Sequence, residues 1–298
     1  MIQKDNFSET TSLMPLLVLV GLILGVGVVS NLLSLGIWEL GDLSMNEVQG
    51  DNLISFGERM LLRIGLSINH LGMFLIPGCI WVYLFRKKDY PPFLKLNSFT
   101  SGHVYLWALI ILCSYPLIAF LSQVNMDLPL AEWMRSSNEA TLNLMEKTLF
   151  MDGIAELLMN LFLVGLLAAF GEELIFRGII QRTFSQHWNN PHLAIWVTAL
   201  IFGLFHMQFE RFIPLAFLGL LLGYAYYYTD SLWSAILLHF INNGLQVLLL
   251  YSTRGEELPK VDKIPEIPIV ITVLSFLLTL SLFYIATRLA NMSDERRP

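Results

Sequence analysis

Three polar groups interrupt long apolar stretches of the chain, and they consist of residue types that can activate water. The first contains two adjacent glutamates and an arginine, and each of the others contains a histidine: Glu172-Glu173-x-x-x-Arg177, Phe202-x-x-x-His206 and His239-x-x-x-Asn243. A charged side chain at the centre of a bilayer costs about 2.5–3.5 kcal/mol, so such residues usually pair with one another and serve a function. We therefore take these residues as the candidate site.

A carboxylate and two imidazoles around one buried cavity can hold a water molecule and accept its proton. Water held between Glu172 and His206 would attack a peptide carbonyl carbon. His239 and the side-chain amide of Asn243 would donate hydrogen bonds to the resulting oxyanion. A covalent intermediate is not indicated, because the chain lacks a Gly-x-Ser-x-Gly motif and neither cysteine lies near a polar motif. The residues thus favour a hydrolase that uses activated water.

The two glutamates are expected to have different tasks. If the helix continues through Arg177, Glu173 and Arg177 lie four residues apart on one face, in the favourable order for an ion pair. Glu172 lies about 100° further round the helix and has no local partner. We therefore expect Glu172 to act on water and the Glu173–Arg177 pair to support it, with a purely structural ion pair as the alternative for these two.

The composition is that of a membrane protein. Of 298 residues, 55% are hydrophobic and 14% charged, and the mean hydropathy is +0.61. A soluble domain carries about 25% charged residues. The net charge of -6 gives no reason to expect nucleic acid as a partner. The two cysteines both fall in apolar runs, so no disulfide framework is indicated.

The apolar runs predict an all-α polytopic bundle of about eight transmembrane helices. We expect a single integral membrane domain over residues 1–298, with the motif-bearing core at about 154–251. The expected spans are Leu13–Leu35, Leu61–Phe85, Val104–Leu121, Leu157–Arg177 and beyond, Leu193–His206, Phe212–Tyr228, Leu232–Tyr251 and Ile267–Leu289.

The three motifs fall on the fourth, fifth and seventh expected spans. Their polar groups can satisfy one another only if these helices converge on one interior cavity. Two conditions follow from the helical rise. The fourth helix must extend well past Arg177, to about Phe184, and Pro191–Ala194 must lie at the cytoplasmic surface.

Basic residues predict the orientation. Arg86, Lys87, Lys88 and Lys95 crowd the loop after the second span, which should therefore be cytoplasmic. Eight spans then place both termini in the cytoplasm, and the expected location is a bacterial plasma membrane. We expect the site to be reached from the cytoplasmic side, and Asn138–Phe150 to form an interfacial helix.

Two pairs of glycines predict close helix contacts. Gly21-x-x-x-Gly25 lies in the first span and Gly219-x-x-x-Gly223 in the sixth. This spacing puts both glycines of a pair on one face, where a neighbouring backbone can approach. We expect both pairs to pack within the bundle.

The order and spacing of the three motifs resemble the CPBP family, the intramembrane proteases that include the type II CAAX prenyl endopeptidases and bacterial proteins linked to bacteriocin immunity. The resemblance covers about Phe170–Gly244. It implies that Glu172 and His206 position the attacking water. It further implies that His239 and Asn243 stabilise the oxyanion, and that Glu173 and Arg177 support the site.

A metal is the open question about this site. The family has been called metalloproteases, and Glu172, His206 and His239 could supply three zinc ligands with a fourth position left for water. Against zinc, the chain has no His-Glu-x-x-His helix, and no carboxylate is identifiable in the sequence that would orient a ligating histidine.

The sequence therefore predicts an intramembrane endopeptidase that acts on a peptide or membrane-protein substrate in the lipid bilayer. Nothing in the sequence identifies a groove for a prenyl group. The alternative is a non-catalytic scaffold or immunity-type protein that binds a peptide in the same cavity. The oligomeric state is left open.

Overall fold

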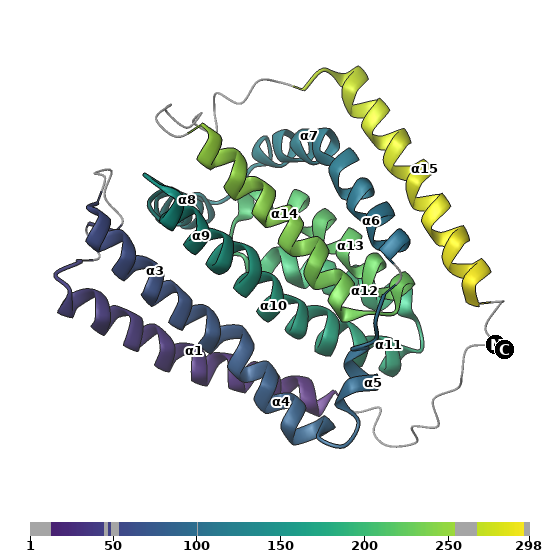
Figure 1. The fold of residues 1–298 in the computed structure, drawn as a ribbon, viewed down its shortest axis with the longest axis horizontal. Helices are drawn as coiled ribbons and strands as arrows, with labels where there is room; N and C mark the ends of the chain where they lie inside the picture. Colours follow the sequence, from purple (N-terminus) through teal and green to yellow (C-terminus); the bar gives the residue numbers. More distant parts are fainter. Residues whose placement is uncertain (1–12, 45–46, 49–53, 100, 254–266, 295–298) are drawn as a thin grey trace.

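The computed structural model describes residues 13–44, 47–48, 54–99, 101–253 and 267–294, and every regular element in these ranges is helical. Figure 1 shows their arrangement. The elements are α1 (Met14–Leu40), α3 (Phe56–His70), η1 (Leu71–Leu75), α4 (Ile76–Arg86), α5 (Tyr90–Leu94), α6 (Ser101–Cys113), α7 (Tyr115–Met126), α8 (Glu132–Leu149), α9 (Ile154–Asn160), η2 (Leu161–Leu167), α10 (Ala168–Glu173), η3 (Leu174–Gln181), α11 (Arg182–Trp188), α12 (Pro191–Phe205), η4 (Phe209–Arg211), α13 (Phe212–Thr229), α14 (Leu232–Ser252) and α15 (Ile269–Asp294).

The all-α polytopic class is confirmed, but the number of spans differs from the prediction. Six helices among the described residues are long and apolar enough to cross a membrane: Met14–Leu40, Phe56–Arg86, Ile154–Trp188, Phe209–Thr229, Leu232–Ser252 and Ile269–Met292. The pair α6 and α7, bent by 43°, would make a seventh. The expected fifth span is α12, whose 15 residues extend only about 22 Å at 1.5 Å per residue. A hydrocarbon core is about 30 Å thick, so α12 is shorter than a full span.

The expected fourth span is one continuous helical rod, Ile154–Trp188, which runs past Phe184 as the site requires. Its hydrogen-bonding pattern changes along its length, because the π-helical segments η2 and η3 flank the short α10. In Figure 1 this rod lies in the middle of the bundle, beside α3 on one side and α14 on the other. Helix α12 begins at Pro191, two residues before the expected fifth span of Leu193–His206.

One end of the bundle carries the basic loop and is called the basic end below. Here the chain after α5 is fixed to the α13–α14 turn, since the backbone N–H of Leu232 donates to the Lys95 carbonyl at 2.9 Å. Lys95 Nζ also lies 2.6 Å from Asp230 Oδ1. The α13–α14 turn therefore lies at the same end of the molecule as the Arg86–Lys95 loop.

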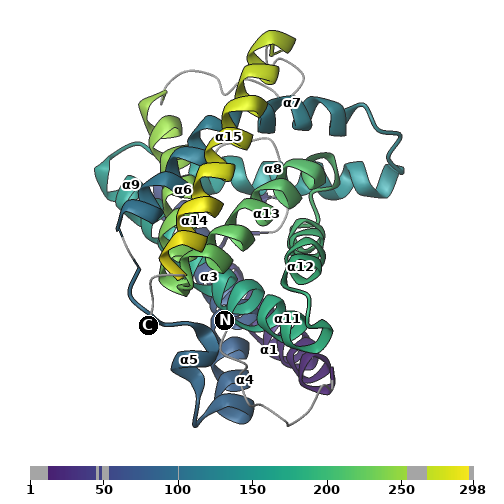
Figure 2. The ribbon, with the colours of Figure 1, turned by 90° about the vertical axis from the view of Figure 1, so that its right-hand side faces the viewer.

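Helix α8 crosses the opposite end of the bundle, which is called the α8 end below. Figure 2 shows α8 running across the bundle, and it contains the segment expected as an interfacial helix. Arg135 and Asn138 of α8 both donate to the Glu210 carboxylate, at 2.9 and 2.6 Å. Lys147 donates to the Val48 carbonyl at 3.0 Å. These contacts hold α8 against the loops on both sides of it.

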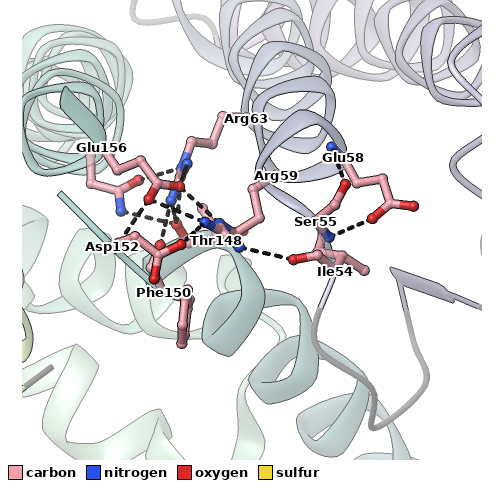
Figure 3. A network of polar contacts seen from close by, with 10 residues as sticks. Ile54, Ser55, Glu58, Arg59, Arg63, Thr148, Phe150, Asp152 and Glu156 are labelled. Atoms are coloured by element: carbon pink, nitrogen blue, oxygen red, sulfur yellow. Dashed lines mark hydrogen bonds and ion pairs between the residues drawn. The ribbon is translucent and has the colours of Figure 1, made fainter. Parts of the chain in front are cut away.

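A buried charge network joins α3 to the start of the rod at the α8 end (Figure 3). Glu156 Oε1 accepts from Arg59 Nε at 2.8 Å and from an Arg63 guanidinium nitrogen at 2.6 Å. Arg63 also donates to the carbonyl oxygens of Thr148 and Phe150, at 3.0 and 2.6 Å. Charged side chains from two helices thus satisfy one another and hold the end of α8 in place.

The two glycine pairs have different surroundings. A Cβ added at Gly219 would lie 3.1 Å from the Phe202 ring, and one at Gly223 would lie 3.0 Å from Ile195. The prediction of close packing is therefore confirmed for α13 against α12. It is wrong for Gly21 and Gly25, since an added Cβ there would meet no atom within 4 Å. A spacing of four residues shows which glycines share a face but not whether a neighbour covers that face.

Candidate active site

Glu172 lies in the interior of the bundle, on α10 between two π-helical segments. Single-turn π-helical insertions change which side chains share a face, and they occur often at functional sites. Only 9% of Glu172 is exposed, although it lies near the middle of the long rod. The carboxylate is thus held inside the protein and not toward lipid.

The structure brings both motif histidines to this carboxylate. Glu172 Oε2 lies 3.7 Å from His206 Nε2 and 3.9 Å from His239 Nε2. These distances are too long for direct hydrogen bonds. They are short enough for one water molecule beside the carboxylate to contact it and an imidazole together. Oε2 is buried and has no hydrogen-bond partner among the described residues.

The other nitrogen of each imidazole is already engaged. His206 Nδ1 lies 2.8 Å from the Phe202 carbonyl oxygen, and His239 Nδ1 lies 2.7 Å from Glu173 Oε1. A carbonyl and a carboxylate only accept hydrogen bonds, so Nδ1 carries the hydrogen in both rings. In a neutral imidazole Nε2 is then an acceptor. Glu172 Oε2 and the Nε2 atoms of the two histidines are thus three acceptors that lie close together. A single water molecule can donate hydrogen bonds to two of them. The third needs a proton on one of the groups or a donor from a substrate.

Glu173 supplies the orienting carboxylate that could not be identified from the sequence. Its Oε1 atom also accepts from an Arg177 guanidinium nitrogen at 2.6 Å, and both side chains are fully buried. Arg177 donates in addition to the Gly219 carbonyl oxygen at 2.8 Å, and its guanidinium carbon lies 4.7 Å from the centre of the Phe202 ring. Glu173 and Arg177 are therefore an ion pair that also fixes the orientation of His239. The sequence missed this because Glu173 and His239 lie 66 residues apart.

Phe202 belongs to a cluster of aromatic rings on one side of the site. Its ring centroid is 5.1 Å from that of Phe176, and Phe205 lies 5.7 Å from Phe176 and 5.2 Å from Phe74. Phe176 follows Glu172 by one turn, and Phe202 precedes His206 by one turn. Phe176 and Phe202 therefore lie nearer the basic end than Glu172 and His206 do.

The aromatic cluster bears on the route to the site, which was expected from the cytoplasmic side. It lies on the basic-end side of the polar groups, whereas the His206 side chain is 24% exposed on the other side. If the basic loop is cytoplasmic, the aromatic rings lie on the side of the site from which access was expected. The side chains instead favour access from the α8 end.

Asn243 is not placed with the other predicted site residues. Its amide nitrogen donates to the Val164 carbonyl oxygen at 3.0 Å, and its side-chain oxygen accepts from Asn242 at 3.0 Å. Among the described contacts none joins Asn243 to Glu172 or to either histidine. Only the second hydrogen of its amide nitrogen is left to serve an oxyanion.

The zinc interpretation does not fit the side chains as they stand. Among the described residues, no group of three or more histidine, cysteine, aspartate or glutamate side chains is arranged to hold a metal ion. Glu172 lies near both histidines, but the three do not form such a group. We therefore develop the chemistry of the site from its side chains alone.

One further histidine, His70 of α3, lies beside the site and was not found from the sequence. It falls within the second apolar run. A polar residue at membrane depth indicates a functional residue, and the same argument was used for His206. It belongs to none of the three motifs, which is why the motif comparison passed over it.

Comparison with known proteins shows a family similarity over the region of the motifs. The family model for Rce1-like type II CAAX prenyl endopeptidases matches residues 154–245, which include all three motifs. This part of the chain, about a third of its length, is therefore similar to the CPBP family. Helices α1, α3–α4, α6–α7 and α15 lie outside the match, so the similarity rests on the rod and on α12 to α14.

A curated relative of the chain is the uncharacterized protein YpbD of Bacillus subtilis (strain 168). It is 31% identical over 86 residues, which make up 28% of this chain and 41% of that protein. The matched region thus spans about two fifths of the length of the relative. No solved structure matches the chain significantly.

Proposed function

We propose that this protein is an intramembrane endopeptidase in which Glu172 and His206 activate a water molecule. The observation that supports this most is the Glu172 Oε2 atom, which is buried, has no hydrogen-bond partner and lies near imidazoles from two other helices. A buried acceptor without a partner is costly, so it is retained where a ligand or a reacting water supplies the donor.

In the proposed reaction, water donates one hydrogen bond to Glu172 and one to His206 Nε2. The water oxygen attacks the peptide carbonyl carbon, and its proton passes to the Glu172 carboxylate. The tetrahedral intermediate then collapses. Its C–N bond breaks, and Glu172 returns the proton to the leaving nitrogen. No residue becomes covalently attached to the substrate.

His239 has a second role that depends on its protonation. A neutral ring with hydrogen on Nδ1 can only accept at Nε2, so it cannot donate to an oxyanion. A protonated ring donates from Nε2, and the Glu173 carboxylate at Nδ1 compensates its positive charge. We therefore assign oxyanion stabilisation to the His239 imidazolium, with Asn243 contributing its remaining amide hydrogen.

The substrate is a peptide or a membrane protein whose cleaved bond reaches the bilayer interior. The molecule is an integral membrane protein, and the proposed location is a bacterial plasma membrane with both termini cytoplasmic. The prenylated substrate named by the family description is not transferred, because that description comes from other proteins.

A cleavage assay tests this function. The purified protein is reconstituted in liposomes with a set of membrane-spanning peptides, and products are identified by mass spectrometry. His206→Ala should abolish cleavage, because the acceptor for the water is lost. His192→Ala, which changes an exposed histidine at the start of the same helix, should leave cleavage intact. Equal cleavage by wild type and His206→Ala would refute the assignment, and peptide binding without any cleavage would favour the scaffold alternative.

Metal dependence is tested on the same preparation. From the side chains alone, we expect cleavage to persist after chelation and the purified protein to carry no stoichiometric metal. Stoichiometric zinc together with loss of cleavage on chelation and recovery on zinc addition would instead support Glu172, His206 and His239 as ligands.

A further inference from the structure

The ring of His70 is held in one orientation at the edge of the site. His70 is the last residue of α3, and the π-helical segment η1 follows it. Its ring stacks on Phe74, with centroids 4.5 Å apart and an interplanar angle of 27°. The Nε2 atom is buried and has no hydrogen-bond partner. Stacking thus fixes a ring whose inner nitrogen is unsatisfied.

Gly171 shows how closely this ring approaches the catalytic helix. A Cβ added at Gly171 would lie 2.9 Å from His70 Nε2 and 2.9 Å from Phe74 Cβ. Any side chain at this position would collide with the ring or with the backbone-proximal part of Phe74. The residue before Glu172 is therefore a glycine that lets the His70 ring lie directly against α10.

The remaining ring contacts define which His70 nitrogen faces the site. Nε2 is the ring nitrogen that lies against α10, and among the described residues it has no hydrogen-bond partner. With or without a hydrogen on Nε2, this atom can form a hydrogen bond with a water molecule. The ring is also close enough to interact electrostatically with Glu172, His206 and His239.

Two buried polar atoms beside α10, His70 Nε2 and Glu172 Oε2, therefore lack a hydrogen-bond partner among the described residues. A buried water can satisfy both, since it donates two hydrogen bonds and such waters are held by two to four polar partners. We propose that His70 is a positioning residue of this site, which holds Glu172 through a shared water on the side facing α3. A carboxylate accepts several hydrogen bonds, so the reacting water beside His206 is accommodated at the same time.

The placement of His70 and its effect on cleavage are separate claims. The placement depends only on the side chains, whereas the effect on catalysis rests on the proposed function. The two are therefore tested by different measurements.

Histidine-selective isotope labelling tests the placement without any assay of activity. The chain has six histidines, so few ring signals need to be resolved, and loss of one signal in His70→Phe assigns that residue. Glu172→Gln changes the charge and donor pattern of the site and should shift the His70 ring signals along with those of His206 and His239. The signals of His187 and His192 should stay in place. Unchanged His70 signals in Glu172→Gln would overturn the proposal.

Kinetics test the effect on catalysis. His70→Phe preserves a ring that can stack on Phe74 but removes both nitrogens, and His192→Phe is the matched control. We expect kcat to fall about 10- to 100-fold for His70→Phe with KM nearly unchanged and with an altered pH profile, because Glu172 loses an orienting contact. His70→Gln, which retains polar side-chain atoms, should recover part of the loss. Wild-type kcat and pH profile in His70→Phe would overturn the positioning role.

Gly171→Ala perturbs the same contact from the other helix. It should lower kcat as His70→Phe does, and the double variant should be no slower than the more impaired single variant, because both changes disrupt one interaction. Additive losses would contradict the shared contact. If the wild type cleaves no substrate, the proposed function fails, while the histidine signals still decide the placement.

Discussion

Of the three buried carboxylates on the rod Ile154–Trp188, those of Glu156 and Glu172 have opposite surroundings. Near its start, Glu156 accepts from Arg59, from Arg63 and from the Asp152 backbone N–H at 2.8 Å. Further along, Glu172 Oε2 has no partner and faces two imidazoles at 3.7 and 3.9 Å. The same helix thus uses one glutamate to hold the fold and leaves another unsatisfied. Polarity at membrane depth alone does not distinguish these two uses, but a count of hydrogen-bond partners does.

The largest expected effect on stability comes from breaking the satisfied network. Glu156→Ala leaves the buried Arg63 guanidinium without a carboxylate and leaves Arg59 with Asp152 alone, and we expect it to lower the free energy of unfolding by about 3–5 kcal/mol. Unfolding in detergent, followed by circular dichroism, measures this. Glu39→Ala, at an exposed position near the end of α1, is the control and should have little effect. A Glu156→Ala variant as stable as the control would contradict the structural role of the network.

Arg177→Ala should combine both kinds of effect. It leaves Glu173 buried without its ion-pair partner, which costs a comparable amount of about 3–5 kcal/mol. It also disturbs the carboxylate that orients His239, so cleavage should be lost even in the fraction that folds. Arg288→Ala, at an exposed position on α15, should change neither quantity. Wild-type stability of Arg177→Ala would refute the buried ion pair.

A smaller effect is expected from the loop that follows His206. The side chain of Asn125 on α7 donates to the Phe209 carbonyl oxygen at 2.9 Å and accepts from the Ile213 backbone N–H at 2.7 Å. Asn125→Leu removes both bonds and should cost about 1–3 kcal/mol in the free energy of unfolding. Since this loop anchors the end of α12, KM or kcat should also change. Val124→Ala, at the exposed neighbouring position, provides the comparison.

The smallest effects separate the two glycine pairs. Gly223→Ala adds a Cβ within 3.0 Å of Ile195 and should destabilise the protein by about 1 kcal/mol. Gly21→Ala meets no atom within 4 Å, so the higher helix propensity of alanine should leave stability unchanged or raise it by up to about 1 kcal/mol. Equal effects of the two substitutions on thermal unfolding would contradict the difference in packing.

The sequence predicted those features that depend on local pattern. Apolar composition predicted the all-helical membrane class, and helical spacing predicted the Glu173–Arg177 ion pair that the structure contains. Spacing also predicted that the rod must continue beyond Arg177, and the apolar run from Leu193 predicted the helix that the structure begins at Pro191. These features follow from the rise and periodicity of one helix.

The features that the sequence did not predict depend on contacts between distant segments. The bond between Glu173 and His239, the approach of His70 to Gly171 and the Arg63 network each join different helices. Helix α12 was counted as a full span because hydropathy measures composition and not whether a helix is long enough to cross the bilayer. No sequence pattern indicated that Phe74, Phe176 and Phe205 would meet beside Phe202, and access from the cytoplasmic side stays a prediction.

The comparison of the two carboxylates is tested most directly by measuring Glu172→Gln for unfolding and for cleavage in parallel. Glutamine keeps the size of the side chain but removes the carboxylate that accepts the proton. We expect turnover to fall by about 10²- to 10⁴-fold, while stability equals or exceeds that of the wild type because no satisfied partner is lost. Wild-type turnover in Glu172→Gln, or destabilisation as large as that of Glu156→Ala, would contradict the assignment of this carboxylate to chemistry.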